Sequence, residues 1–217
     1  VMLEAKIAGV SLRLSEVADQ LHLSRSKAAV GFAAEIQESI REMELPYASF
    51  EVSLSDVPLC TTGHDAVMFR FSSSGKNPVE VAKCASGGEL SRIMLAVKAV
   101  LADSDAIPTL IFDEIDTGIS GRTAQKVSER LSYIAKKHQV LCITHLAQIA
   151  SMADTHFLIE KTVQQQMTMT GIRKLKPSEQ IEELARMLGG VEITEKVLEN
   201  AQEMKNQAFQ LKTKNCQ

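Results

Sequence analysis

The spacing of apolar residues at the start of the chain is typical of a coiled coil. Apolar positions alternate at intervals of four and three: Leu3, Ile7, Val10, Leu14, Val17 and Leu21. The register breaks at residues 22–24, where Ser24 has a side chain suited to cap a second helix, and the next amphipathic segment stops before Pro46. The pattern predicts the end of a coiled-coil arm. Two ordinary helices packed on a core are the alternative.

Two stretches with period-two alternation, residues 49–54 and 66–71, predict a pair of antiparallel strands. A second strand pair is expected at 155–161 and 166–170. Beyond it the pattern predicts two further helices: residues 178–188, and a last helix from about Thr194.

Between these stretches lie two short apolar runs, residues 108–112 and 139–143, separated by an amphipathic helix at 122–137. This order predicts parallel strands that are buried on both faces. The first run ends on Asp113 and Glu114, and the second is followed by His145. Because parallel strands end at the same edge of a sheet, the three side chains are expected there together. Adjacent carboxylates at such an edge favour a nearby cation such as Mg²⁺.

A glycine-containing loop precedes the first of these runs. The block Ala85–Arg92 opens into a helix whose stripe is Leu90, Met94, Val97 and Leu101. Free backbone N–H groups and the positive end of the helix dipole meet at such a start, and glycines allow close approach of a ligand. The block is therefore a candidate receptor for a phosphate.

Composition narrows the class of protein. The 217 residues are enough for one substantial domain and an extension, and 24 basic side chains against 27 acidic ones exclude a globally basic surface. Four cysteines without a Cys-x-x-Cys pair argue against a disulfide framework or a cysteine zinc site and fit a reducing cytoplasm. Apolar runs are too short to span a membrane. The start on Val1, within a helical pattern, is expected of a fragment.

Together these motifs resemble the signature, the Walker B motif and the switch histidine of an ABC-type ATPase head. The blocks 85–92, 113–121 and 143–148, with Glu89 where transporters usually carry glutamine, closely resemble the RecN family of bacterial SMC-like ATPases, which act in double-strand-break repair and recombination. The resemblance implies an α/β, P-loop NTPase-like fold: the C-terminal lobe of the head with a mainly parallel sheet. The implied domains are a coiled-coil arm (1–45), this lobe (46–205) and a flexible tail (206–217).

The resemblance also implies roles for individual residues. Glu114 would polarise the attacking water, Asp113 would hold Mg²⁺ directly or through water, and His145 would contact the γ-phosphate and the water. Ser120 stands where many relatives carry the aspartate of the D-loop. A second set would bind the γ-phosphate of ATP held by a facing head: Ser86, Gly87, Gly88 and Glu89.

The only Gly-Lys pair, Gly75-Lys76, is followed by Asn77 and Pro78, so it reads as a turn and not as a phosphate loop. The resemblance places the phosphate loop (Walker A) in the N-terminal half of the same head, and the chain alone is expected to be inactive. The expected partners are that half, a second head in a homodimer, and DNA, with no membrane. The expected location is the cytoplasm, at the nucleoid.

Two alternatives remain at this point: another SMC-like chromosome-organising ATPase, and a non-enzymatic coiled-coil interaction module. Taken singly, the carboxylate pair reads as a solvated loop start and His145 as a strand-end histidine. The basic cluster Arg173, Lys174 and Lys176 reads as a solvated face. Structural or surface roles are expected for the other histidines: His22, His64, His138 and His156.

Overall fold

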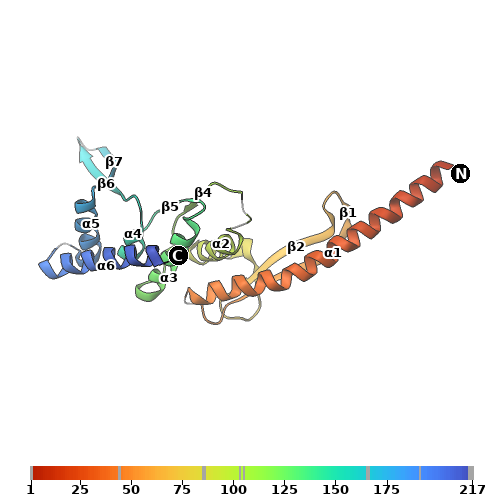
Figure 1. Ribbon diagram of the computed structural model, residues 1–217, viewed down its shortest axis with the longest axis horizontal. Coiled ribbons are helices and arrows are strands. Elements are labelled where there is room, and N and C mark those ends of the chain that lie inside the picture. Colours follow the sequence, from red (N-terminus) through yellow and green to blue (C-terminus); the bar gives the residue numbers. More distant parts are fainter. Residues whose placement is uncertain are drawn as a thin grey trace. The chain divides into compact units, whose positions relative to one another are not determined.

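A computed structural model describes residues 2–43, 45–84, 87–102, 104, 106–164, 167–190 and 192–214. The chain forms two compact units, Val1–Val100 and Leu101–Gln217, and each is described by itself (Figure 1). In the first unit, β1 and β2 pack along the first helix. Within the described residues no helix combines the length and the apolar character needed to cross a membrane.

The first unit begins with α1, a continuous helix of 41 residues, Met2–Glu42 (Figure 1). The predicted break at residues 22–24 is therefore wrong. Ser24 is exposed on the helix surface, and the neighbouring turn is held by His22 and Arg25, which both contact Asp65 of β2. These tertiary contacts outweigh the weak capping preference of one serine, as packing commonly outweighs local propensity.

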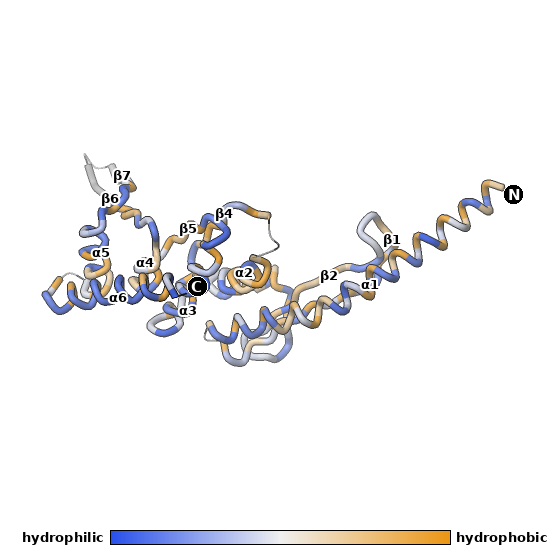
Figure 2. The backbone as a smooth tube through the Cα atoms, in the orientation of Figure 1, coloured by the Kyte–Doolittle hydropathy of each residue, from blue (hydrophilic) through white to orange (hydrophobic). Residues whose placement is uncertain are grey.

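The two halves of α1 differ in burial. Figure 2 shows apolar residues recurring along the whole helix. In the second half Ile36 and Ile40 are fully buried, as the second amphipathic segment predicts. In the first half the predicted coiled-coil seam is exposed: Leu3, Ile7, Val10, Leu14, Val17 and Leu21. Such a stripe is stable in water only against a partner helix.

The predicted antiparallel pair is confirmed as β1 (Ser49–Cys60) and β2 (Gly63–Ser72). A short β3 (Val79–Glu80) extends the sheet in the order β1-β2-β3, and a 3₁₀ turn, η1 (Val81–Lys83), follows. The hairpin packs on α1 through Phe69, whose ring centroid lies 6.1 Å from that of Phe32 in α1. Within the hairpin, the Phe69 centroid lies 5.8 Å from that of Phe50. The helix α2 (Gly87–Leu101) completes this unit.

Gly75-Lys76 is a turn, as predicted. Gly75 has φ +75°, and an added Cβ would lie 2.7 Å from the Tyr47 carbonyl oxygen, so a side chain there would clash with backbone. The Ser72 hydroxyl donates to the carbonyl oxygen of Lys76 at 2.6 Å, which closes the turn.

The second unit contains β4 (Thr109–Phe112) and β5 (Gln139–Cys142), which pair in parallel with Phe112 opposite Cys142. The helix α3 (Gly121–Ile134) connects them and buries its predicted stripe: Ala124, Val127, Leu131 and Ile134. Burial of both sheet faces was expected, but Ile111 is 69% and Leu141 45% exposed. The expectation is wrong for this chain because the described residues cover only one face of the pair.

The remaining elements are α4 (Ala147–Ser151), β6 (Phe157–Gln164), β7 (Met167–Lys174), α5 (Pro177–Gly189) and α6 (Glu195–Lys214). The predicted second strand pair is confirmed, since β6 and β7 are antiparallel. Leu184, Ala185 and Ala201 pack together at the centre of α4, α5 and α6.

The predicted flexible tail differs from the structure, because α6 remains helical to Lys214. Ala208 is buried, and the Lys205 ammonium donates to the carbonyl oxygens of Ser151 and Ala153, each at 3.0 Å. The Lys212 ammonium also contacts the Asp154 carboxylate at 2.6 Å. These contacts fasten the last turns of α6 to the segment after α4.

Candidate functional site

The carboxyl ends of β4 and β5 carry the predicted polar residues. Asp113 and Glu114 directly follow β4, and His145 lies three residues beyond β5. The Ile143 amide donates to the Phe112 carbonyl at 3.0 Å, so the parallel pairing continues to this edge. All three residues therefore follow the strands at the same edge of the pair, as expected.

Asp116 joins the two strand ends. Its side chain is almost fully buried, with the residue 3% exposed. One carboxylate oxygen, Oδ2, accepts from the Thr144 hydroxyl at 2.6 Å and from the His145 amide at 2.8 Å. The same oxygen lies 3.1 Å from His145 Nδ1. Charge-assisted bonds of this kind fix the loop after β4 to the loop after β5.

Glu114 has an uncommon backbone conformation. Its φ is +57°, in the left-handed region that a residue with a Cβ seldom adopts. Its amide donates to Asp113 Oδ1 at 2.9 Å, and the Thr117 amide donates to its carbonyl at 3.1 Å. Strained backbone of this kind concentrates at functional sites, and here it leaves the Glu114 side chain exposed to solvent.

The donor atoms at this edge suit a hard cation. Asp113 and Glu114 are both exposed and offer carboxylate oxygens, the ligands that Mg²⁺ prefers. The His145 side chain is 73% exposed, so it is accessible to a ligand. Among the described residues, these three side chains do not bring one ligand atom each within 4.8 Å of one another.

Cys142, at the end of β5, is not a reactive thiol. Burial, reinforced by the charges of Asp116 and Asp113, raises its pKa to about 12. The thiolate is the nucleophilic form, so this cysteine stays protonated and inert near neutral pH. Its proximity to both carboxylates shows that the edge carries a negative potential.

The signature block lies in the other unit, at the start of α2. The helix begins at Gly87, so Gly87 and Gly88 contribute amides of the first turn, whose N–H groups have no partner within the helix. Gly88 is buried. Ala85 and Ser86, including the predicted phosphate-contacting hydroxyl, lie outside the described residues.

Glu89 contributes charge to the same helix start. Burial lowers the pKa of Arg92, and the carboxylate of Glu89 opposes this effect. Burial and then Glu89 raise the pKa of the Cys84 thiol. Glu89 therefore interacts electrostatically with Arg92 one turn further along α2.

Ser120, at the predicted D-loop position, precedes α3. It is the N-cap residue, but its side chain makes no capping bond, and its carbonyl accepts from the Thr123 amide at 3.2 Å. The structure thus gives Ser120 a backbone role at the start of α3.

The sequence did not indicate the roles of Asp116 and Thr144, and only structural or surface roles were expected of His22 and His64. The structure brings His22 and His64 together around Asp65. Asp116 and Thr144 lie in the loops that follow β4 and β5, but no local pattern indicated that their side chains contact each other. No sequence pattern indicated the histidine cluster, because His22 lies 42 positions before His64 and 43 before Asp65, and only the folding of the hairpin onto α1 brings them together.

No family model matches the chain. Two solved structures share its fold. The Smc head domain with a coiled coil and joint from Pyrococcus yayanosii has a TM-score of 0.60 at 18% identity, covering 84% of this chain and 34% of that one. The Smc head domain with an extended coiled coil from Pyrococcus furiosus has a TM-score of 0.53 at 19% identity, covering 85% and 45%. The fold is therefore that of the Smc head class.

Sequence relatives identify the family within this class. DNA repair protein RecN of Halalkalibacterium halodurans is 40% identical over 216 residues, which cover 97% of this chain and 38% of the relative. The Haemophilus influenzae RecN is 43% identical over 195 residues, covering 88% and 35%. The chain belongs to the RecN family, which confirms the resemblance of its motifs. It spans between a third and two fifths of the length of these relatives.

Proposed function

We propose that this chain supplies part of the ATP-hydrolysing head of a RecN-type protein that acts in double-strand-break repair and recombination. The observation that carries the proposal is the common edge of β4 and β5, where Asp113, Glu114 and His145 follow the two strands and Asp116 joins the two loops. The relatives' name, DNA repair protein RecN, supports the biological role.

Each residue at the edge has a proposed role. Glu114 accepts a proton from the attacking water as general base, and its exposed side chain suits this task. Asp113 holds Mg²⁺, which neutralises phosphate charge when bound. His145 holds the γ-phosphate and the water, and its ring is oriented by the 3.1 Å contact with Asp116.

In this proposal, the ATP site is completed by the rest of the protein and by a second head. The phosphate loop lies in the part of the relatives' length that this chain does not span, so the chain alone is inactive. Ser86, Gly87, Gly88 and Glu89, at or before the start of α2, bind ATP held by a second head. ATP then links a homodimer, and hydrolysis releases it. DNA, at the nucleoid in the cytoplasm, is the proposed substrate of this cycle.

The test is ATP hydrolysis by this chain mixed with a separately expressed remainder of the protein. Activity is expected only in the mixture, and Glu114→Gln should abolish turnover while ATP still promotes dimer formation in light scattering. The matched control is Glu192→Gln, the same change at an exposed glutamate outside the motifs, which should leave turnover unchanged. Unchanged turnover with Glu114→Gln would refute the assignment of the base.

Two alternatives predict different results. A non-enzymatic coiled-coil interaction module would keep the mixture inert while the chain still associates through α1. Another SMC-like chromosome-organising ATPase would hydrolyse ATP without a role in repair. The 35–43% identity to RecN proteins, against 18–19% to the Smc heads, favours the RecN assignment over that one.

A further inference from the structure

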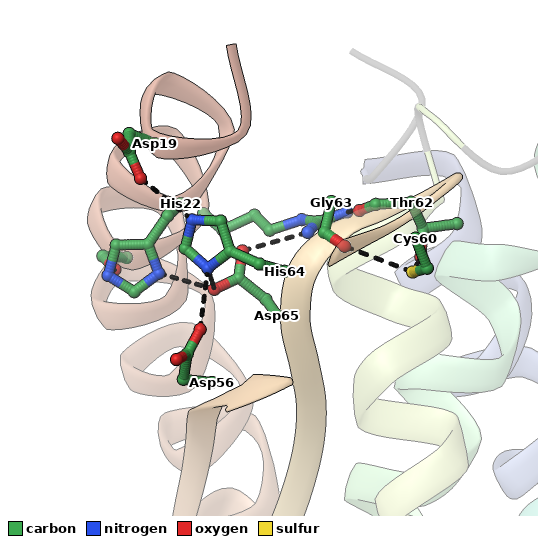
Figure 3. Close-up of polar contacts among 10 residues, drawn as sticks. Asp19, His22, Asp56, Cys60, Thr62, Gly63, His64 and Asp65 are labelled. Atoms are coloured by element: carbon green, nitrogen blue, oxygen red, sulfur yellow. Dashed lines mark hydrogen bonds and ion pairs between the residues drawn. The ribbon is translucent and has the colours of Figure 1, made fainter. Parts of the chain in front are cut away.

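Two histidines from distant parts of the first unit converge on one carboxylate (Figure 3). His22 comes from α1, and His64 and Asp65 come from β2. His22 Nδ1 lies 2.5 Å from Asp65 Oδ1, and His64 Nδ1 lies 3.9 Å from the same oxygen. Ligand atoms of all three residues lie within 4.8 Å of one another. The imidazole rings are stacked, with centroids 5.5 Å apart.

The outer contacts of this cluster orient its members. His64 Nε2 lies 3.2 Å from Asp19 Oδ1, at ion-pair distance though without good hydrogen-bond geometry. His22 Nε2 lies 3.4 Å from the Ser26 hydroxyl. His22 thus turns Nδ1 toward Asp65 and Nε2 toward a hydroxyl oxygen. His64 turns Nε2 toward Asp19, and its Nδ1 lies 3.1 Å from Asp56 Oδ1 and 3.9 Å from Asp65 Oδ1. Contacts of the second ring nitrogen are what orient a metal-binding histidine.

Arg25 fixes the carboxylate itself. Its guanidinium donates to Asp65 Oδ2 at 3.0 Å and to the Thr62 carbonyl at 2.8 Å. The Asp65 side chain is only 1% exposed. Oδ2 is therefore held by Arg25, and Oδ1 is the oxygen that faces the two histidines.

The cluster has an excess of negative charge. Three carboxylates, those of Asp19, Asp56 and Asp65, surround the histidines, and Arg25 offsets one of them. The surroundings thus favour an additional cation.

We propose that His22, His64 and Asp65 form a binding site for Zn²⁺ that clips the β1–β2 hairpin to α1. Two imidazoles and one carboxylate are a ligand set that Zn²⁺ accepts in tetrahedral sites, with a water or the nearby Asp56 carboxylate as the fourth ligand. This site uses no cysteine and shares no residue with the proposed ATP site. The ion would hold α1, which forms the predicted arm, against the hairpin.

The geometry needs only a small adjustment to bind the ion. Ligand distances of about 2.0–2.2 Å place neighbouring ligand atoms of a tetrahedral zinc roughly 3.3–3.5 Å apart. The 2.5 Å and 3.9 Å separations at Asp65 Oδ1 bracket that value, so each of these two separations needs to change by less than about 1 Å. A pocket whose wall includes Ser15 and Leu59 opens over the cluster and provides a path from solvent.

The test is a zinc titration of the complete chain after metal removal, in competition with a chromophoric chelator. One Zn²⁺ per chain is expected, together with a rise in melting temperature when Zn²⁺ is added. His22→Gln and His64→Gln should each weaken the affinity by more than about tenfold, and Asp19→Asn by about tenfold through loss of ring orientation. The matched control is His156→Gln, which removes a histidine outside the cluster and should leave the affinity unchanged.

A direct reading of the ligands keeps the test independent of any folding defect in the variants. X-ray absorption of the zinc-loaded wild-type chain should show a first shell of nitrogen and oxygen atoms with the scattering pattern of two imidazoles. The proposal is overturned by the absence of stoichiometric binding, by sulfur in the first shell, or by wild-type affinity in folded His22→Gln and His64→Gln variants.

Discussion

Asp116 shows how one buried carboxylate organises the edge that carries the candidate ATPase residues. Replacing it with asparagine keeps the shape but removes the charge that the Thr144 hydroxyl and the His145 amide contact. We expect Asp116→Asn to lower the free energy of unfolding of the second unit by about 1–3 kcal/mol, because hydrogen bonds to a buried charged group are lost. Urea denaturation, with hydrogen exchange of peptides covering residues 109–116 and 139–146, measures the effect and locates it.

Glu114→Gln is the matched control for that experiment, since it makes the same carboxylate-to-amide change two residues away. Its side chain is exposed, so the free energy of unfolding should stay within about 0.5 kcal/mol of wild type. Equal losses from the two substitutions would contradict the structural role of Asp116. A larger loss of unfolding free energy for Asp116→Asn would show that Asp116 stabilises the edge, whereas Glu114 is free to serve the proposed reaction.

His156 makes the second unit sensitive to acid. Burial lowers the pKa of its imidazole, the charge of Lys205 adds to the shift and that of Glu183 opposes it. Its Nδ1 is buried without a hydrogen-bond partner among the described residues. The unfolded chain therefore takes up a proton at higher pH than the folded one, so this contribution to stability is complete above pH ~6.5 and is lost as pH falls below it.

The prediction is that His156→Gln reduces the loss of stability on acidification. Urea denaturation at pH 7.5 and pH 5.5 gives the change in the free energy of unfolding for each protein, and the wild type should lose more than the variant. Because both proteins share all other titrating groups, the contributions of those groups cancel when the two changes in unfolding free energy are subtracted. A variant as acid-sensitive as the wild type would show that His156 does not carry the effect.

Among the elements, α1 has a second half whose apolar residues are buried within this chain and a first half whose apolar residues are exposed. Ile36 is fully buried, whereas Ile7, on the same helix, is exposed. We expect Ile36→Ala to cost about 2–5 kcal/mol of the free energy of unfolding, and Ile7→Ala to change it by less than about 0.5 kcal/mol. Urea denaturation of the two variants tests this pair directly.

The same pair tests the coiled-coil interpretation in a longer protein. If a partner helix covers the seam there, Ile7→Ala becomes destabilising, because the side chain now loses buried contacts. Denaturation of the full-length variant, compared with this chain, decides the point. A neutral Ile7→Ala in both contexts would mean that the stripe has no partner.

The elements also show what could be predicted from the sequence. The strands, the crossover helix and the parallel pairing followed from local periodicity, because apolar spacing reports directly on which face is buried. The break at Ser24 was predicted wrongly, since contacts from Asp65 to His22 and Arg25 decide that stretch and no local pattern encodes them. The end of α6 was likewise set by contacts of Lys205 with the segment after α4.

The candidate site also has features that could be predicted from the sequence and features that could not. Asp113, Glu114 and His145 could be placed at one edge because strand ends are local features and parallel order fixes their side. The connecting role of Asp116 could not be derived, because it depends on the loop geometry that aims its carboxylate at Thr144. The positive φ of Glu114 was equally hidden, as glutamate carries no preference for that conformation.

For the whole molecule, the open face of the parallel strand pair indicates where the remainder of the protein docks. Ile111 and Leu141 lie opposite each other in the register of β4 and β5, and both are exposed, as is Ile143 two residues further on. Parallel sheets are normally covered on both faces. In a chain that spans between a third and two fifths of its relatives' length, the missing cover is expected from the rest of the head.

Binding of this chain to the separately expressed remainder measures that contact. Ile111→Ser should raise the dissociation constant by about 10–100-fold, because burial of an isoleucine side chain stabilises a complex by roughly 1.5–3 kcal/mol. Ile172→Ser is the matched control, since this β7 residue is equally exposed at 68% against 69%, and its affinity should equal that of wild type. Calorimetric titration measures the affinity of each variant. Equal affinities for Ile111→Ser and Ile172→Ser would show that the rest of the head docks elsewhere and does not cover the open strand face.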